Sequence, residues 1–557
     1  MSGPRRPQLR TGLAATVAAA IATTVAALIV TALVLASPET GGHATAVTRT
    51  VGATDPSKRI DVSLILRMPR RAALARFLAA IENPRSRSYG RTLRPTQFGA
   101  RFGLPAPELA GLQRALGARR LTVARLFPQR TSLQVRGTVR ELESVFATHL
   151  VDRVDARGQG YFAPVTRPRI PGWLAADVQG VTGLSTQPVM RAADVPAGGL
   201  DPGTLGKAYD IAPLRSQGIT GTGQTVAVIS FDSFKNDDLG LFQSRFGLTG
   251  PAVQHVQVHG GTLPGSGQQE VNLDIDTIRS IAPGAQILDY EAPQGATTDA
   301  DVINQIVADG RARVISSSWG RCDLLVTDAE RSADETALAA ARAAGITVFA
   351  ASGDNGAYDC QAENLTDQRL SVDWPAASEN VVAVGGTRLA VRKDGTYLAE
   401  YGWEDVLKGD GSGGGLASAT GRPSWQTGPG VQNAYSNGRR QLPDVAGPAD
   451  PDSGMVVISG GSVHQVGGTS AAAPFWAGTL LLARQYAQRH GGRDLGFIAP
   501  ALYTIAANPR TANAFHHSIR GGNRRYSVTA GWNYVDGLGS PDVAVLARDL
   551  AGALPAQ

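Results

Sequence analysis

The chain has 557 residues, enough for more than one domain, and its 43% apolar and 18% charged residues are typical of a globular protein. Its net charge of +6 is unevenly distributed, because residues 51–190 have a net charge of +13 and residues 191–557 a net charge of −10. The basic residues are dispersed, aromatic residues are sparse and no binding motif is present, which excludes a nucleic-acid-binding protein. We expect the basic segment to dock on the acidic remainder of the same chain.

Residues 1–46 predict a membrane anchor or a signal segment. Three arginines within the first ten residues precede an uncharged run, 11–36, that is rich in Ala, Val and Leu. As a helix this run is about 39 Å long, enough to cross a hydrocarbon core of ~30 Å. Ala44-Thr-Ala46 resembles a cleavage site, so a cleaved signal is the alternative. Either interpretation predicts export to the cell surface or the extracellular space, with membrane attachment until this segment is processed.

Residues 55–190 predict a compact α+β domain, and the Pro- and Gly-rich stretch 191–203 predicts an exposed linker. Short alternating runs predict strands, and apolar residues at helical spacing predict helices between them. The expected strands are Asp61–Leu66 and Ser132–Val135, and the expected helices are Arg71–Ile81, Glu108–Leu116 and Thr138–His149.

In residues 204–557, strand-like segments alternate with helices, which predicts an α/β fold with a mainly parallel sheet. Site residues in such folds gather at the carboxyl ends of the strands. The expected strands are Gln224–Phe231, Val314–Ser318, Ile346–Ala351 and Asn380–Val384, and the expected helices are Ala329–Ala344 and Ser470–Arg489.

Ser470 follows the small-residue turn Gly467-Gly-Thr469 and precedes an apolar helix, an arrangement typical of a nucleophilic serine. Such a serine needs a base to take its proton, and the usual base is histidine. None of the 8 histidines stands in a motif of the subtilisin kind. A different base is therefore expected if the chain is a hydrolase.

Glu270 and Asp274 are the candidates for that base. Apolar residues at helical spacing surround them, so the two carboxyls lie one turn apart on the same helix face. On an exposed face they would be an ordinary acidic pair. In a closed site they would share a proton, and one apparent pKa would rise. A carboxylate base of this kind predicts activity at acidic pH.

Five motifs in order resemble those of sedolisins, the serine-carboxyl peptidases with a subtilisin-like fold. The resemblance extends over most of residues 204–545. The motifs are Glu270-x-x-x-Asp274, Ser316-Ser-Ser-Trp319-Gly320, Ser352-Gly-Asp354-Asn-Gly356, Pro443-Asp-Val445 and Gly468-Thr-Ser470-x-x-x-Pro474.

The resemblance implies a role for each matching residue. Ser470 would be the nucleophile, Glu270 the general base and acid, and Asp274 the residue that orients Glu270 and shares its proton. Asp354 would stabilise the oxyanion, which requires a protonated carboxyl and again favours low pH. Trp319 and Gly320 would line the substrate site, although Trp319 is equally expected as an ordinary core aromatic.

Residues 55–190 more loosely resemble the activation prodomain of sedolisins. Asn83-Pro-Arg-Ser-Arg-Ser-Tyr89-Gly90 and Val178–Leu184 carry this resemblance. It implies a zymogen whose own prodomain is an intramolecular inhibitor. We expect acid to weaken the attraction between the basic and acidic segments and so permit self-cleavage.

Cys322 and Cys360, the two cysteines of the chain, both lie beside the proposed site. In an exported protein we expect them to form a disulfide, and the alternative is two unpaired small apolar side chains.

The calcium site that the resemblance implies has lost its carboxylates. Phe-x-Asp-Ile-Thr and Gly-Trp-Asp are typical of the family, whereas this chain has His517 and Asn533 at the acidic positions. Because Ca²⁺ prefers charged oxygen ligands, we expect this site to be lost or weak. The pairs His516-His517 and His255-x-x-x-His259 lack the pattern of a zinc motif. We therefore expect no metal ligands, and no cofactor that the chemistry requires.

The expected function is that of an exported, acid-active endopeptidase that hydrolyses polypeptides through a Ser-Glu-Asp triad. One alternative is a tripeptidyl exopeptidase of the same family. Another is a catalytically silent binding protein on this fold, although the complete set of Ser, Glu and Asp residues argues against it. A zinc peptidase is the third.

Overall fold

The computed structural model describes residues 49–83, 85–154, 160–187, 199–294 and 299–552. The predicted anchor or signal, 1–46, and most of the predicted linker lie outside these residues. Contacts divide the chain into two units, one of residues 1–51 with 153–160 and one of residues 52–152 with 161–557. The second unit holds every element that the site depends on.

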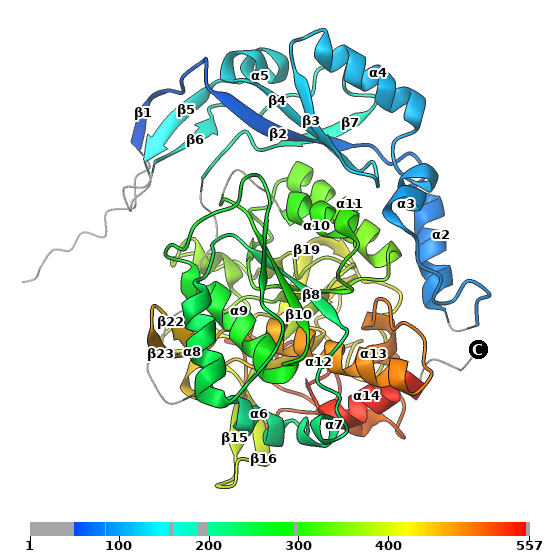
Figure 1. The fold of residues 1–557 in the computed structure, drawn as a ribbon, viewed down its shortest axis with the longest axis vertical. Coiled ribbons are helices and arrows are strands. Elements are labelled where there is room, and N and C mark those ends of the chain that lie inside the picture. Colours follow the sequence, from blue (N-terminus) through cyan, green and yellow to red (C-terminus); the bar gives the residue numbers. More distant parts are fainter. Residues whose placement is uncertain (1–48, 84, 155–159, 188–198, 295–298, 553–557) are drawn as a thin grey trace, which may run out of the picture. The chain divides into compact units, whose positions relative to one another are not determined.

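The first half of the second unit is the expected α+β segment. Four antiparallel strands form a sheet in the order β3-β4-β2-β7. Helices α4 and α5 pack on this sheet through buried leucines (Figure 1). Helix α5 begins with a capping box, in which Thr138 and Glu141 each bond the other's backbone N–H. The strands of this sheet are β2 (Arg59–Leu66), β3 (Thr122–Leu126), β4 (Ser132–Thr138) and β7 (Val178–Thr182), and the helices are α2 (Arg71–Glu82), α3 (Pro95–Arg101), α4 (Ala106–Gly117) and α5 (Val139–Phe146). Strands β1 (Arg49–Ala53), β5 (Leu150–Val154) and β6 (Gly160–Pro164) contain the boundaries of the two units along the chain.

The second half is the expected α/β fold, built on an eight-stranded sheet. The strand order is β16-β15-β13-β11-β8-β10-β9, and β21 also pairs with β15. All neighbours are parallel except β15 and β16. The strands are β8 (Thr225–Ser230), β9 (Gln254–Gln257), β10 (Gln286–Glu291), β11 (Val314–Ser317), β13 (Thr347–Ala351), β15 (Val382–Val391), β16 (Tyr397–Gly402) and β21 (Val445–Pro448).

Two pairs of helices cover this sheet. Helix α9 packs on α12, α10 packs on α11, and Figure 1 shows the two pairs on different sides of β8 and β10. Helix α12 also contacts β11, β13, β15 and β21. The helices are α6 (Pro202–Ala208), α7 (Ala212–Ser216), α8 (Asn236–Phe246), α9 (Gln268–Ile281), α10 (Asp299–Asp309), α11 (Asp328–Ala343), α12 (Thr469–Arg489), α13 (Ala499–Ala507) and α14 (Val543–Gly552).

Shorter elements connect these layers. They are β12 (Arg321–Cys322), β14 (Asp373–Trp374), β17 (Glu404–Asp405), β18 (Asp410–Gly411), β19 (Gly415–Gly421), β20 (Arg439–Leu442), β22 (Met455–Ser459), β23 (Ser462–Val466), β24 (Phe515–His516) and β25 (Ser540–Pro541), with the 3₁₀ turns η1 (Asp359–Ala362), η2 (Pro451–Ser453) and η3 (Ala512–Ala514). Within the described part of the chain, no helix combines the length and apolar character that a bilayer span needs.

A buried ion pair holds the end of β20 beside the start of β21. Arg440 and Asp444 are fully buried, and Arg440 donates from Nη1 and Nη2 to the two carboxylate oxygens at 2.7 and 2.5 Å. Asp444 also accepts from the Tyr503 hydroxyl and the Ala383 backbone N–H, both at 2.8 Å. These bonds satisfy a charge that burial would otherwise make costly.

Replacing Arg440 by Met leaves Asp444 buried without its cation. We expect R440M to lower the free energy of unfolding by about 3–5 kcal/mol. Arg136 forms the same kind of pair with Asp61 at 2.7 Å, but on the surface. R136M should therefore cost no more than ~1 kcal/mol. Urea unfolding of both variants measures the difference, and equal shifts would contradict the expectation.

Candidate functional site

Ser470 is the second residue of α12, where the helix begins against the carboxyl ends of β11 and β13. Gly468 precedes the helix with a φ of 101°, a conformation that favours glycine. The Ser470 hydroxyl lies 3.4 Å from the Ser318 carbonyl oxygen, and the side chain is almost fully buried. The N-terminus of a helix favours negative charge that develops on this oxygen or beside it.

Glu270 and Asp274 lie one turn apart on α9 and are both buried, with exposed fractions of 2% and 0%. The approach of α9 to α12 requires Gly478, because a Cβ there would lie 2.7 Å from the Ile281 Cβ. Glu270 Oε1 and Asp274 Oδ2 are buried oxygens without a hydrogen-bond partner. In the described part of the chain, no Lys or Arg pairs with either carboxyl.

The electrostatics of this pair follow from its burial. Burial raises the pKa of Glu270 to about 8, and the Ser470 hydroxyl, which hydrogen-bonds the carboxylate, acts in the opposite direction. Burial and then the charge of Glu270 raise the pKa of Asp274 well above its ordinary range. The two carboxyls therefore hold a proton between them at a pH where exposed carboxyls are ionised.

Ser318 joins the carboxyl pair to Ser470, a role that the sequence analysis did not assign. Its hydroxyl donates to Asp274 Oδ1 at 2.5 Å and lies 3.1 Å from the Ser470 carbonyl oxygen. Ser318 directly follows β11, and the Ser-Ser-Ser-Trp motif is the sequence pattern that could have identified it. Strand register alone places this hydroxyl beside α9.

Asp354 follows β13 and lies against the start of α12. Its Oδ1 accepts from the Thr469 backbone N–H at 2.7 Å and from the Thr469 hydroxyl at 2.8 Å. A Cβ at Gly468 would meet Asp354 Oδ2 at 2.6 Å, so this glycine gives the carboxyl its room. Burial raises the pKa of Asp354, and the two bonds from Thr469 oppose that rise. A carboxyl with a raised pKa is protonated over a wider range of pH.

Trp319 and Gly320 occupy different environments. Trp319 is 2% exposed and packs edge-on against Phe231 at 5.8 Å between ring centroids. It also contacts Gly267 at the start of α9, where a Cβ would lie 2.8 Å from the indole ring. Gly320 lines the cavity that contains Ser470, whereas Trp319 does not. The tryptophan is thus a buried aromatic beside the start of α9, and its part in substrate binding stays a prediction.

The cavity that contains Ser470 and Asp354 is lined by several further acidic residues that the sequence analysis missed. Asp359 and Asp373 are 2% and 6% exposed, and each has one buried oxygen without a hydrogen-bond partner. Burial and neighbouring carboxyls raise the pKa of both well above the ordinary range. Glu363 and Asp410 also line the cavity, and Arg321 is its one basic lining residue among those that the structure describes.

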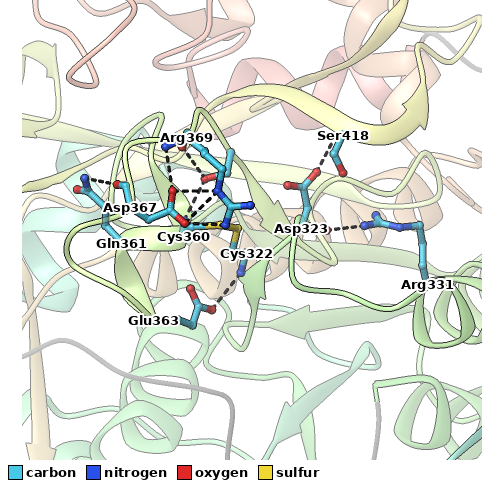
Figure 2. The surroundings of a disulfide bond; sticks show 10 residues. Cys322, Asp323, Arg331, Cys360, Gln361, Glu363, Asp367, Arg369 and Ser418 are labelled. Carbon is cyan, nitrogen blue, oxygen red and sulfur yellow. Dashed lines mark hydrogen bonds and ion pairs between the residues drawn. A yellow bond between two sulfur atoms is a disulfide. The ribbon is translucent and has the colours of Figure 1, made fainter. Parts of the chain in front are cut away.

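The predicted disulfide between Cys322 and Cys360 is confirmed, and it ties β12 to η1 (Figure 2). Turn η1 begins at Asp359, so the bridge holds one wall of the acidic cavity. The Glu363 carboxylate accepts from the Cys322 backbone N–H at 3.2 Å and reinforces the same junction. No sequence pattern revealed this wall, because its residues come from turns rather than periodic elements.

The C-terminal segment does not fit a calcium ion. The Asn533 amide donates to Asp536 Oδ1 at 2.6 Å, and the Ser518 backbone N–H donates to Oδ2 at 2.9 Å. Asn533 Oδ1 accepts from the backbone N–H groups of Val535 and Asp536. Protein donors thus occupy oxygens that would have to face Ca²⁺. The loss of this site stays a prediction, and we assign Ca²⁺ no role in the chemistry.

Comparison with known proteins gives consistent matches over most of the chain. Residues 46–187 match the model of the pro-kumamolisin activation domain, and residues 252–512 match that of the subtilase family. Kumamolisin from Bacillus sp. (strain MN-32) is 31% identical over 526 residues, which cover 88% of this chain and 91% of the relative. Sedolisin from Pseudomonas sp. (strain 101) is 30% identical over 528 residues, which cover 89% and 87%. A solved structure of Pseudomonas sedolisin, a serine-carboxyl proteinase in complex with pseudo-iodotyrostatin, aligns with a TM-score of 0.57 at 30% identity, covering 65% of this chain and 100% of that one.

Proposed function

Because the chain belongs to the sedolisin family of serine-carboxyl peptidases, we propose that it is an exported endopeptidase made as a zymogen and active at acidic pH. The observation that carries this proposal is the meeting of the Ser470 hydroxyl with a buried carboxyl pair and a further carboxyl, Asp354. No histidine lines the described cavity around Ser470. The disulfide supports export, since such bonds persist in oxidising compartments.

Proton transfer from Ser470 to Glu270 would begin the reaction. The freed oxygen attacks the carbonyl carbon of the peptide, and negative charge develops on the carbonyl oxygen. Glu270 then returns the proton to the leaving amine, and an ester between the acyl group and Ser470 remains. Water attacks this ester by the same sequence, and Ser470 is regenerated. Asp274 keeps Glu270 in position and takes a share of its proton, and Ser318 holds Asp274 through their 2.5 Å bond.

Asp354 would supply the hydrogen bond to the developing oxyanion. Its Oδ1 is engaged by Thr469, and Oδ2 lies close to Gly468 and is free to carry the proton. Only the protonated form donates, so this contribution is present at low pH and is lost as the pH rises through the raised pKa of Asp354. The decline of activity at alkaline pH then follows from the oxyanion donor, whereas the base, whose pKa burial raises to about 8, does not by itself impose it.

Replacing Asp354 separates these two contributions. In D354N, the new side chain would accept the Thr469 bonds through its carbonyl oxygen and donate through its amide at any pH. We expect D354N to keep measurable activity and to lose the decline of kcat/KM at the alkaline side of the profile. D354A should lower kcat by about 10²–10³. A pH–rate profile that is identical in D354N and the unchanged enzyme would contradict the role of Asp354.

The activation prodomain contacts the peptidase segment through neutral hydrogen bonds and also through charged groups, among them Ser63 with Asp301 at 2.6 Å and Arg167 with Asp328 at 3.8 Å. Gln129 and Thr131 donate to Asn304 Oδ1, both at 2.8 Å. Among the ion pairs between the prodomain and the peptidase segment, the most buried joins Glu82 to Arg342 at 2.5 Å. Its acidic member, Glu82, belongs to the segment with the basic net charge. The buried bonds between the prodomain and the peptidase segment thus do not follow the net charges of the two segments. We propose that shape and these specific bonds hold the prodomain in place.

Ser470→Ala tests the proposed activity directly. At pH 3–5 we expect the unchanged chain to shorten itself and to cleave a denatured protein internally, whereas S470A should do neither. The lost rate should be at least ~10³-fold, because the other hydroxyls that line the cavity, those of Ser318 and Thr469, already donate to Asp274 and Asp354. Mass spectrometry of the products distinguishes internal cleavage from the release of tripeptides, the alternative activity. Cleavage that survives in S470A would overturn the mechanism.

The acidic cavity favours a basic side chain next to the scissile bond. A guanidinium or ammonium group would pair with the unpartnered oxygens of Asp359 and Asp373 and favour their ionised forms. We expect D373N to lower kcat/KM for peptides with Arg before the scissile bond by about 10–100-fold, the value of a charge-assisted hydrogen bond. Matched peptides with Leu should change little. D405N, which alters a carboxyl on β17 that does not line the cavity, is the control.

A further inference from the structure

A second cluster of ionisable side chains lies on β9 and β10, apart from the cavity around Ser470. His255 pairs in register with Asp289, and Glu291 lies two residues further along β10 on the same face. Asp289 and Glu291 are fully buried, whereas the His255 side chain is one-third exposed. His259, four residues after His255, lies beyond the end of β9 and contacts Gln134 instead.

Hydrogen bonds satisfy this cluster only in part. Glu291 Oε1 accepts from the Ser233 hydroxyl at 2.7 Å and lies 2.5 Å from His255 Nδ1. Asp289 Oδ1 accepts from the Ser230 hydroxyl. Asp289 Oδ2 is buried and accepts no hydrogen bond from an N–H or O–H donor of the described residues, although the neighbouring Glu291 carboxyl can share a proton with Asp289. Asp289 Oδ2 lies on the face that carries His255 and Glu291, and a bound cation would give this buried oxygen a partner.

The charges of the cluster are also unbalanced. His255 is the one cationic group that pairs with either carboxylate among the described residues, and no Lys or Arg does so. When both carboxyls are ionised, they carry more negative charge than one imidazole can neutralise, so the pair holds either a proton or a cation. Asp232 adds to this charge from the adjacent turn, where it binds the backbone N–H groups of Gly265 and Gly267.

We propose that His255, Asp289 and Glu291 bind one divalent transition-metal cation of the Zn²⁺ type. One ligand atom from each residue lies within 4.8 Å of the others, a spacing compatible with metal–ligand bonds of about 2.0–2.2 Å. An imidazole nitrogen with two carboxylate oxygens suits zinc better than calcium. The exposed side of His255 leaves a path for the ion and a position for water. This proposal departs from the expectation, drawn from sequence, that the chain has no metal ligands.

The ion would act on stability rather than on the reaction itself. None of its three ligands lines the cavity around Ser470. Ser233 and Asp232, however, connect the cluster to Gly267, the residue before α9. Phe234 stacks on the His255 ring, with 4.4 Å between the ring centroids, and covers that face of the imidazole. A bound cation would therefore hold the turn after β8 against the start of the helix that carries Glu270.

Calorimetry with ZnCl₂ tests the proposal on the full chain carrying S470A, which keeps it intact, after treatment with EDTA. We expect one zinc equivalent that disappears, or weakens by at least ~10–100-fold, in both H255A and D289N. D289N keeps the shape of the side chain and its bond to Ser230, and H255A alters a partly exposed residue, so one variant serves if the other fails to fold. H490A removes an exposed histidine elsewhere and should bind zinc unchanged.

The melting temperature gives an independent measurement. Zinc should raise it in the S470A chain and in H490A but not in D289N, because a ligand of the native state stabilises that state. CaCl₂ at the same concentration should not reproduce the shift. Zinc binding in D289N and H255A that equals that of the S470A chain, the absence of a zinc equivalent in the S470A chain, or an equal shift with calcium would each overturn the proposal.

Discussion

The constraint on which the site depends is the burial of two carboxyls, Glu270 and Asp274, in a helix that contacts α12 through Gly478. Buried carboxyls without a Lys or Arg partner keep a proton, and a shared proton makes the pair both an acceptor and a donor. Because the pair faces the start of α12, Ser470 needs no histidine. A carboxyl pair in the place of an imidazole base is thus a consequence of one packing arrangement.

The parallel sheet brings the other groups to this pair. Ser318 follows β11, Asp354 follows β13, and both meet the first turn of α12 at the carboxyl edge of the sheet. The disulfide, which Figure 2 shows between Cys322 and Cys360, then ties η1 to β12. Turn η1 begins at Asp359 and is a wall of the cavity. Residues from distant parts of the sequence form one site because each follows a strand of the same sheet or is cross-linked to its edge.

Burial also reduces how much the carboxyls of the peptidase segment contribute to its charge at the surface. The peptidase segment counts as strongly acidic in sequence, yet several of its carboxyls, including Asp274, Asp289 and Asp373, lie inside the fold. Buried carboxyls have raised pKa values and contribute little to attraction at the surface. This is why the prodomain contact relies on groups such as Asn304 and on a Glu82–Arg342 pair of opposite polarity. Asp289, one of these buried carboxyls, is also a ligand of the cation proposed beside His255.

The sequence by itself determined the fold class, the helices predicted over Arg71–Ile81 and Ser470–Arg489, the family and the residues proposed for the chemistry. These are local or ordered patterns, since helical spacing and motif order survive without knowledge of long-range contacts. Tertiary structure alone decided that Trp319 is buried beside the start of α9, that Asp359 and Asp373 line the cavity around Ser470, and that His255 joins Asp289 rather than His259. These outcomes depend on strand register and on the distance between turns. Neither produces a periodic pattern of residues that could be recognised in the sequence.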